Sequence, residues 1–338
     1  MTPLVTIAIP VYKRLNYLPG ALRAVAAQTY QQIDLLVSDN GENGGAVEKL
    51  AAAHYPRPYR VRANPRSVSI VAHFNQLIDA AQGVFFVLLS DDDEISPNFV
   101  AELVGLLERR PGAAVALPRL ETFSEDGNRV LGATEAGPMP PEVMSGMEFV
   151  RTWGEHRYKY LSFTTHLART AGLIAAGGYP EFDRANGSDN ALLVKQVIGR
   201  EVLFSPRCTF RHRIHDTSYG KTASTASLAT ASRQFLAFLD HDPQLRALRH
   251  TDPAAWAELR RLLRDLIYRT YLGRWRKFYR DRMGGLAWAR AGFALPAHPR
   301  YTRQVLAELF YSLPGLGELA RRWRRAAYSA CKPKERAS

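Results

Sequence analysis

The chain has 338 residues, of which 46% are hydrophobic and 23% charged, a composition typical of a folded globular protein. Its two cysteines, Cys208 and Cys331, lie far apart in the sequence, which excludes a disulfide scaffold and a thiolate-rich metal cluster. No apolar run reaches the roughly 18 residues of a membrane-spanning helix, and the first ten residues lack the basic leader of a signal peptide. We therefore expect a soluble or peripheral protein of the reducing cytoplasm.

The charge is unevenly distributed along the chain. Residues 1–220 carry 22 basic and 23 acidic side chains, whereas residues 221–338 carry 23 basic and 9 acidic ones, so the net charge of +13 lies in the last third. A neutral body followed by a basic region indicates an anionic partner for that region, either a phospholipid surface or a nucleic acid. We predict a catalytic domain over residues 1–220 and a basic helical region over 221–338.

Short apolar runs alternate with amphipathic stretches over the first 118 residues. The apolar runs predict strands at residues 4–10, 33–38, 59–63, 84–89 and 113–117. Apolar residues at a spacing of three and four predict helices at residues 17–28, 46–53, 69–81 and 97–108. This alternation predicts an α/β fold with a mostly parallel sheet sandwiched by helices.

The pattern is less regular after residue 118. Residues 119–150 look like an insertion, and residues 177–190 form a turn-rich loop. We predict strands at 160–167, 201–204 and 207–213, and helices at 171–176 and 190–198. From residue 221 onward the pattern is helical. An apolar stripe between Trp256 and Phe278 fits either core packing or the interface of an anionic membrane.

Polar residues follow three of the predicted strands. They are Tyr12, Lys13 and Arg14 after the first strand, Asp39 and Asn40 after the second, and Asp91, Asp92, Asp93 and Glu94 after the fourth. The carboxyl ends of parallel strands meet at one edge of a sheet, where ligands bind. We therefore expect these side chains to converge.

The acidic run SDDDE at residues 90–94 is the strongest signal for chemistry. Three adjacent carboxylates repel one another unless a cation is present. Two of them can bind one hard divalent ion, whose other ligands are then water and phosphate oxygens. The alternative is a solvated acidic start of the helix near Pro97. The position directly after a buried strand favours the metal site.

The other two strand ends carry weaker signals. Asp39 can accept hydrogen bonds from a base or ribose, or it can form an Asx-turn that opens the segment GENGG. Tyr12 can present its ring to a nucleobase, with Lys13 or Arg14 reaching a phosphate, or it can pack against the protein while the basic residues are solvated.

Taken together, these segments resemble glycosyltransferase family 2, which has the GT-A fold. The resemblance spans about residues 3–220 and rests on four segments: TIAIPVYKR, AVAAQTYQQIDLLVSDNG, NQLIDAAQGVFFVLLSDDDEISPNFV and LIAAGGYPEFDRANGSDNALLVKQVIG. The third contains the D-x-D motif of the family, and the fourth is similar to its acceptor-side segment. The resemblance implies a donor half over about residues 1–118 and an acceptor half over about 119–220.

The resemblance also implies roles for individual residues. The residues implied to bind the donor are Pro10, Tyr12, Lys13, Asp39, Asp91 and Asp92. Asp93 and His215 are implied as ligands of Mn²⁺ or Mg²⁺, and Asp189 as the general base on the acceptor hydroxyl. Three positions depart from the family pattern. Lys13 replaces a common Asn, Ser188 replaces the usual Glu before Asp189, and Arg66 stands near where a small residue is more usual.

The expected function is that of an inverting glycosyltransferase. It would move a sugar from a nucleotide-diphosphate donor, most commonly UDP in this family, to a saccharide or lipid-linked acceptor. A single acceptor-side base favours direct displacement. Alanine- and arginine-rich usage fits a GC-rich bacterium, and hence cell-surface polysaccharide or glycolipid assembly at the inner face of the membrane.

Two alternatives are weighed against this function. A sugar nucleotidyltransferase would carry a glycine-rich loop after the first strand, where this chain has PVYKRLNY. A non-enzymatic basic protein would bind anions through the C-terminal region alone. The sequence has no helix-turn-helix, zinc-finger or RNA-recognition pattern, so we expect no nucleic-acid partner.

Overall fold

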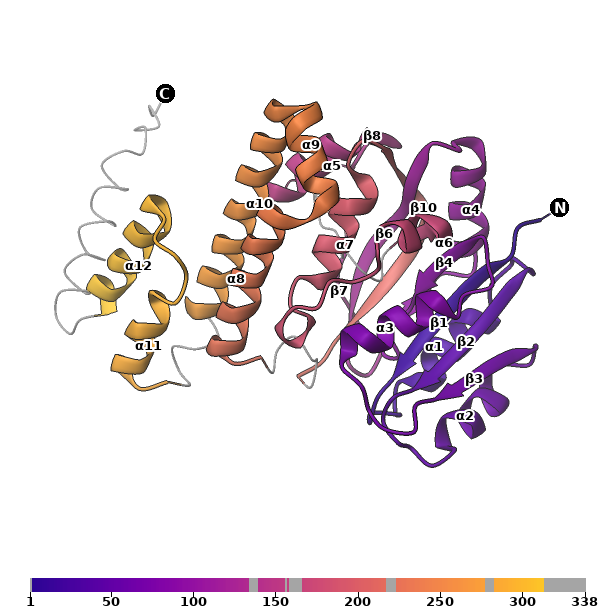
Figure 1. Ribbon diagram of the computed structural model, residues 1–338. Coiled ribbons are helices and arrows are strands. Elements are labelled where there is room, and N and C mark those ends of the chain that lie inside the picture. Colours follow the sequence, from indigo (N-terminus) through magenta and orange to yellow (C-terminus); the bar gives the residue numbers. More distant parts are fainter. Residues whose placement is uncertain are drawn as a thin grey trace, which may run out of the picture. The chain divides into compact units, whose positions relative to one another are not determined.

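The computed structural model describes residues 2–133, 139–155, 157, 166–216, 223–276 and 283–312. The chain forms two compact units, Met1–Asp265 and Leu266–Ser338 (Figure 1). The first unit contains the whole sheet and two of the C-terminal helices, α8 (Thr225–His241) and α9 (Pro243–Thr251). The functional boundary at residue 220 stays a prediction.

Within the described residues, ten strands form one sheet in the order β3-β2-β1-β4-β9-β6-β10-β5, with β7 beside β6 and β8 beside β10. The strands are β1 (Val5–Val11), β2 (Ile33–Asp39), β3 (Tyr59–Ala63), β4 (Phe85–Leu88), β5 (Glu94–Ile95), β6 (Ala113–Ser124), β7 (Val130–Ala133), β8 (Val143–Ser145), β9 (Leu167–Arg169) and β10 (Glu201–Ile214). Strands β3, β2, β1 and β4 are parallel to one another, as are β6 and β10, whereas β5, β7, β8 and β9 pair antiparallel.

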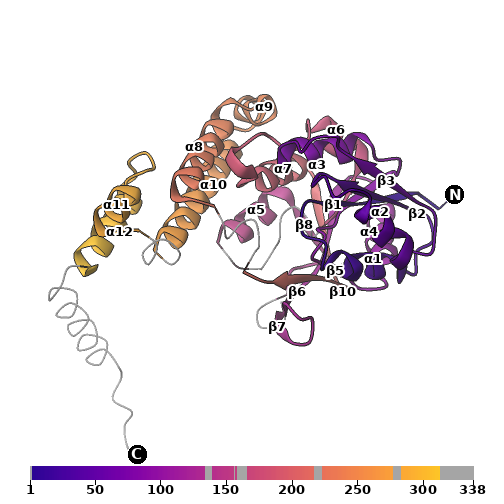
Figure 2. The same ribbon diagram turned by 90° about the horizontal axis from the view of Figure 1, so that it is seen from below.

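Helices cover both faces of the sheet. One face packs against α1 (Leu18–Ala26), α2 (Ala46–His54) and α4 (Phe99–Arg109), whose apolar residues share one core with β1, β2 and β4. The helices α3 (Ile70–Asp79), α6 (Thr170–Ala175) and α7 (Ser188–Val197) lie on the opposite face. Figure 2 shows the strands between these two layers. The predicted α/β fold is confirmed.

Local sequence explains the elements that position the site. Every residue of β4 is buried, as are all but one of β1, so both faces of these strands are covered. Helix α1 has a proline in its first turn, and the Ser69 hydroxyl accepts a hydrogen bond from Ala72 N at 3.1 Å at the start of α3. The position before β4 is occupied by glycine, Gly83, since a Cβ there would lie only 2.4 Å from Thr6 N.

The structure differs from the prediction in three places after residue 117. Strand β6 continues to Ser124, so the first part of the expected insertion belongs to the sheet. The two strands predicted at 201–204 and 207–213 form one long strand, β10, with a register shift between Ser205 and Thr209. Strand β9 begins at Leu167, and most of the strand predicted at 160–167 lies outside the described residues.

The C-terminal region is helical where it is described. The helices α10 (Pro253–Arg274), α11 (Gly285–Gly292) and α12 (Pro299–Ser312) follow α9. The predicted apolar stripe is core, since Leu263, Tyr271 and Trp275 are buried and Trp275 stacks on Trp288 with ring centroids 4.4 Å apart. Phe278 and the basic cluster at residues 321–325 lie outside the described residues. None of the described helices has the length and hydropathy needed to cross a membrane.

Candidate active site

The loops after β1, β2 and β4 meet at the carboxyl edge of the sheet. Arg14, after β1, donates from Nη2 to Asp91 Oδ1 at 3.1 Å and to Asp92 Oδ2 at 2.6 Å. Asn43, after β2, donates from Nδ2 to the Tyr12 carbonyl and to Asp39 Oδ1. The predicted convergence of the strand-end residues is thereby confirmed.

Asp39 closes the loop that follows β2. Its Oδ1 accepts from Gly41 N at 2.7 Å and its Oδ2 accepts from Asn43 N at 3.1 Å, which is the Asx-turn weighed from the sequence. A Cβ on Gly41 would lie 2.0 Å from the Tyr12 carbonyl oxygen, so only glycine fits between the two loops. The contribution of Asp39 to nucleotide binding stays a prediction.

Tyr12 presents its ring to solvent at this edge. The residue is 52% exposed, and Lys13 Nζ lies 5.5 Å from the ring centroid. Pro10, two residues earlier in β1, is half-buried. An exposed ring beside a cation can take a stacked base and its phosphates, and the roles of these three residues stay predictions.

The three aspartates after β4 point in different directions. Asp93 is only 2% exposed, and its Oδ1 accepts from Arg213 N at 2.9 Å and lies 3.0 Å from His212 Nδ1. Asp92 instead faces His215, whose Nε2 lies 2.7 Å from Asp92 Oδ2. His215 is thus brought to Asp92, whereas Asp93 is directed into β10.

Electrostatics at this turn follow from burial and from the crowding of like charges. Burial and, to a lesser extent, the neighbouring Asp92 carboxylate raise the pKa of Asp91 to about 7, although Arg14 opposes the rise. Burial also raises the pKa of Asp93, against the hydrogen bonds from His212 and Arg213. The turn is an acidic site whose charge is balanced by cations of the protein.

Arg213 is a residue that sequence reasoning did not single out. Its Nε donates to the Asp92 carbonyl at 2.9 Å, its Nη1 to the Glu125 carbonyl at 2.7 Å and its Nη2 to Glu94 Oε1 at 2.9 Å. The Phe123 ring lies 4.3 Å from its guanidinium carbon. Arg213 therefore fixes the backbone of the aspartate turn. The sequence feature that could have identified Arg213 is the alternation of basic residues in RHRIH, which lies at the end of the strand that pairs with β5.

The acceptor-side segment begins with a glycine turn. Gly177 and Gly178 have φ of 78° and 68°, which favours glycine. The Asn75 side chain holds the next residue by both of its polar atoms, accepting from Tyr179 N at 2.7 Å and donating to the Tyr179 carbonyl at 3.0 Å. A Cβ on Gly178 would lie 2.4 Å from Asn75 Oδ1, so the turn and α3 are in close contact.

Asp189 lies in the first turn of α7, where a carboxylate is favoured by the helix dipole. The preceding segment is strained, because Arg184 and Ala185 have φ of 51° and 55°, in the left-handed region. Burial raises the pKa of Tyr179, and the nearby Asp189 carboxylate adds to the rise. The half-buried position of Asp189 suits a base that meets an acceptor, and that role stays a prediction.

The residues at the aspartate turn fit a divalent metal only in part. Within the described residues, no group of three or more His, Cys, Asp or Glu side chains could hold a metal ion. Asp92 and His215 offer one carboxylate and one imidazole, a donor set that fits Mn²⁺ better than Mg²⁺ when phosphate oxygens supply further ligands. The arrangement fits a metal that is shared with a diphosphate.

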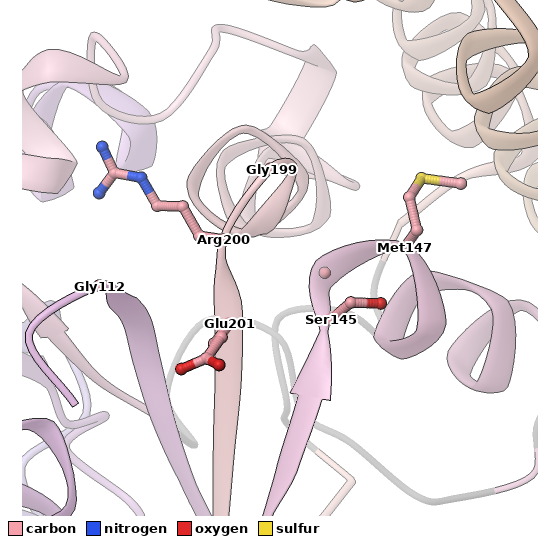
Figure 3. Close-up of a pocket in the computed structure, with 7 residues that line it drawn as sticks. Gly112, Ser145, Met147, Gly199, Arg200 and Glu201 are labelled. Carbon is pink, nitrogen blue, oxygen red and sulfur yellow. The ribbon is translucent and has the colours of Figure 1, made fainter. Parts of the chain in front are cut away.

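A cavity of about 490 Å³ lies at the other end of the sheet (Figure 3). It is lined by Gly112, Gly199, Arg200 and Glu201, which stand at the amino ends of β6 and β10. The aspartate turn follows the carboxyl end of β4, so this cavity is separate from the candidate active site.

The sheet and the helices that cover it match a known fold. A mostly parallel sheet with helices on both faces and a D-x-D turn after β4 is the architecture of the GT-A glycosyltransferases. Residues 6–167 match the model of glycosyl transferase family 2. This part of the chain is therefore similar to glycosyl transferase family 2, as the resemblance in the sequence predicted.

Two solved structures illustrate the similarity of fold. Residues 1–349 of S. aureus TarS in complex with UDP-GlcNAc align with a TM-score of 0.64 and 14% identity, over 91% of this chain and 84% of that one. The mannosyltransferase PcManGT of Pyrobaculum calidifontis, in complex with GDP-Man and Mn²⁺, aligns with a TM-score of 0.50 and 14% identity, over 90% of this chain and 84% of that one.

Curated relatives match only part of their own length. An uncharacterized glycosyltransferase of Rickettsia conorii is 33% identical over 128 residues, which are 37% of this chain and 21% of that protein. An uncharacterized protein of Sinorhizobium fredii is 32% identical over 235 residues, which are 68% of this chain and 24% of that protein. The chain thus spans about a fifth to a quarter of these two relatives.

Proposed function

We propose that the chain is a metal-dependent inverting glycosyltransferase, which transfers a sugar from a nucleoside diphosphate to an acceptor hydroxyl. The observation that carries this proposal is the Asp92–His215 pair, with Arg14 beside it, at the carboxyl edge of the sheet in a domain similar to family 2. A carboxylate, an imidazole and a guanidinium at one strand end suit a diphosphate and its counterion.

The donor nucleotide binds over the loops after β1 and β2. The exposed ring of Tyr12 stacks on the base, with Pro10 and Asp39 lining the pocket, and Lys13 reaches toward the phosphates. TarS and PcManGT are described with UDP-GlcNAc and GDP-Man, which supports uracil and guanine nucleotides as the first candidates. UDP remains the first choice, as the family pattern implies.

The metal-binding residues are Asp92 and His215, with Asp91 facing the ribose or phosphate. This assignment replaces the Asp93–His215 pair expected from the sequence, because Asp93 is occupied by His212 and the backbone of Arg213. A divalent cation held there would offset the negative charge that develops on the departing diphosphate.

Asp189 acts as the general base. The acceptor oxygen forms a bond to the anomeric carbon while the bond from that carbon to the diphosphate oxygen breaks, and the hydroxyl proton passes to the Asp189 carboxylate. A single displacement of this kind inverts the configuration at the anomeric carbon. General-base catalysis typically contributes about 10²–10⁴-fold in rate.

The basic C-terminal region serves a lipid-linked or saccharide acceptor at an anionic membrane, in cell-surface polysaccharide or glycolipid assembly. Supporting this, α11 and α12 expose Leu286 (68%), Leu306 (53%) and Phe310 (48%) near Arg290 and Arg303 in the sequence. Exposed apolar side chains mixed with cations suit a peripheral position at the inner leaflet.

The test is a turnover assay with UDP-GlcNAc and GDP-Man in the presence of Mn²⁺. We expect slow release of UDP or GDP without acceptor, and its loss in Asp92→Asn. A parallel assay with UTP or GTP and the matching sugar 1-phosphate tests for a sugar nucleotidyltransferase, which would release pyrophosphate there. Release of pyrophosphate in that assay, with no release of UDP or GDP from the nucleotide-sugars, would overturn the proposal.

A further inference from the structure

We infer that the Arg14 guanidinium occupies the cation position of the aspartate turn while the donor is absent, so that metal and diphosphate bind together and neither binds tightly alone. This inference rests on the proposed function and adds a positioning role for Arg14. The inference concerns how binding of the metal depends on binding of the diphosphate. Four observations support it.

The first observation is the sharing of one oxygen atom. Asp92 Oδ2 lies 2.6 Å from Arg14 Nη2 and 2.7 Å from His215 Nε2. The same Arg14 nitrogen also donates to Asp91 Oδ1 at 3.1 Å, so it bridges the two carboxylates. A cation bound by Asp92 and His215 would need the place that this nitrogen fills.

The second observation is the charge at the turn. Asp91 and Asp92 have side chains that are each 13% exposed, so solvent screens them only weakly. One guanidinium already balances part of their charge. A divalent cation and a guanidinium side by side would repel each other, unless a further anion such as a diphosphate were present.

The third observation is the partial exposure of the Arg14 side chain and its place in a loop. Arg14 lies in the loop between β1 and α1, and its side chain is 28% exposed. Its buried Nε has no hydrogen-bond partner among the described residues, and the Tyr17 ring lies 5.1 Å from the guanidinium carbon. The side chain can therefore leave the carboxylates while it still covers Tyr17.

The fourth observation is that the guanidinium of Arg14 matches the oxygens of a diphosphate. A guanidinium has a planar fork of donors that matches phosphate oxygens, and such charge-assisted pairs are strong. The free Nε and a released Nη2 together form that fork. A diphosphate thus attracts Arg14 and clears Asp92 for the metal, which couples the two binding events.

The test measures Mn²⁺ binding calorimetrically at pH 8, first alone and then in the presence of UDP or GDP. The wild-type chain should bind Mn²⁺ weakly alone and at least tenfold more tightly with the preferred nucleotide. Arg14→Met keeps the stem and removes the charge, so it should tighten binding of Mn²⁺ alone by about tenfold and lose most of the coupling.

Two further variants complete the design. Arg14→Lys keeps the charge without the fork and should lie between the wild type and Arg14→Met. Arg23→Met, on the exposed face of α1, is the matched control and should behave as the wild type does. Thermal melts of all three establish that they fold, and Arg14→Lys carries the test if Arg14→Met does not fold.

Two outcomes would overturn the inference, and they are distinguishable from each other. If Mn²⁺ binds with UDP or GDP but its affinity alone is the same or weaker in Arg14→Met, Arg14 does not compete with the metal, and the proposed function stands. If Mn²⁺ binds to none of the chains even with nucleotide, the metal site of the proposed function fails and the inference fails with it.

Discussion

Three consecutive aspartates at one strand end differ in the set of partners that each contacts. Asp91 accepts from Arg14, Asp92 contacts both Arg14 and His215, and Asp93 is buried against His212 and Arg213. Adjacent residues of a turn point in different directions, so neighbours in sequence have different chemistry. One of them can bind a ligand while the next holds the fold.

A matched pair of variants separates these two roles. Asp92→Ala should lose Mn²⁺-dependent nucleotide affinity and keep a melting temperature near that of the wild type. Asp93→Ala should lower the unfolding free energy by about 2–3 kcal/mol, because it leaves the buried Arg213 N–H without its acceptor. Calorimetric titration and urea unfolding measure the two effects. The opposite pattern would make Asp93 the ligand and Asp92 the structural residue.

Buried histidines predict how stability depends on pH. Burial lowers the pKa of His73 and that of His166 to about 4, and His73 Nε2 lies 2.8 Å from Ser38 Oγ. The unfolded chain, with histidine pKa near 6.5, binds more protons between pH 6.5 and 4. Stability contributed by the neutral ring is thus complete above pH 6.5 and is lost as the pH falls toward 4.

His73→Gln isolates this effect, since Asp91, with its raised pKa, changes stability in the opposite direction over part of the range. Between pH 7 and 4.5 the wild type should lose about 2–3 kcal/mol more than the variant, measured by urea unfolding. Parallel curves for the two chains would show that His73 is not buried as a neutral ring.

The sequence predicts which residues reach the site but not how each is oriented. Spacing alone puts Asp91–Asp93 at the end of a buried strand, next to Arg14 in space. The partners of Asp92 and Asp93 come from β10, about 120 residues later in the chain, and which oxygen faces which partner depends on that pairing. The contact of His212 with Asp93 depends on the same pairing.

At the scale of elements, regular patterns were predicted well. Strand β3 has the predicted bounds, and the helices predicted at 17–28 and 69–81 are observed as α1 and α3 with shorter ends. Strand β10 was predicted as two strands because Pro206 interrupts its apolar pattern. In the structure it pairs with β6 on both sides of Pro206 and is one strand. Long-range pairing of this kind has no local signal.

Gly83 tests how closely β1 and the turn before β4 approach. In Gly83→Ala the new Cβ would lie 2.4 Å from Thr6 N and 2.7 Å from the Leu4 carbonyl oxygen, both backbone atoms. We expect a loss of about 3 kcal/mol or more in unfolding free energy, because the strand must shift. The control is Gly112→Ala, which has open space around the added atom. Equal stability of the two variants would contradict the close approach.

At the scale of the whole molecule, the charge is concentrated in the C-terminal third, where buried aromatics from α10 to α12 pack on one another. Tyr271 donates to the Ala291 carbonyl at 2.8 Å, and Trp275 donates to the Trp288 carbonyl at 2.8 Å. The sequence could not separate a core stripe from a membrane stripe, because both use the same helical spacing.

The membrane proposal predicts selective binding to anionic vesicles. The chain should sediment with vesicles that contain phosphatidylglycerol, less so at high salt, and little with phosphatidylcholine alone. Leu306→Ser combined with Phe310→Ser should weaken sedimentation several-fold, since both side chains are exposed on α12. Binding that ignores lipid charge, or that the double variant leaves unchanged, would contradict a peripheral anionic interface.

The central claim is that the aspartate turn binds a nucleoside diphosphate together with a divalent cation. The most direct measurement is the thermal shift of the wild type and of Asp92→Asn with UDP or GDP, each with and without Mn²⁺. We predict that one nucleotide raises the melting temperature of the wild type by several degrees only when Mn²⁺ is present, and that Asp92→Asn shows no such rise. An unshifted wild type in every condition, or an equal shift in Asp92→Asn, would contradict the claim.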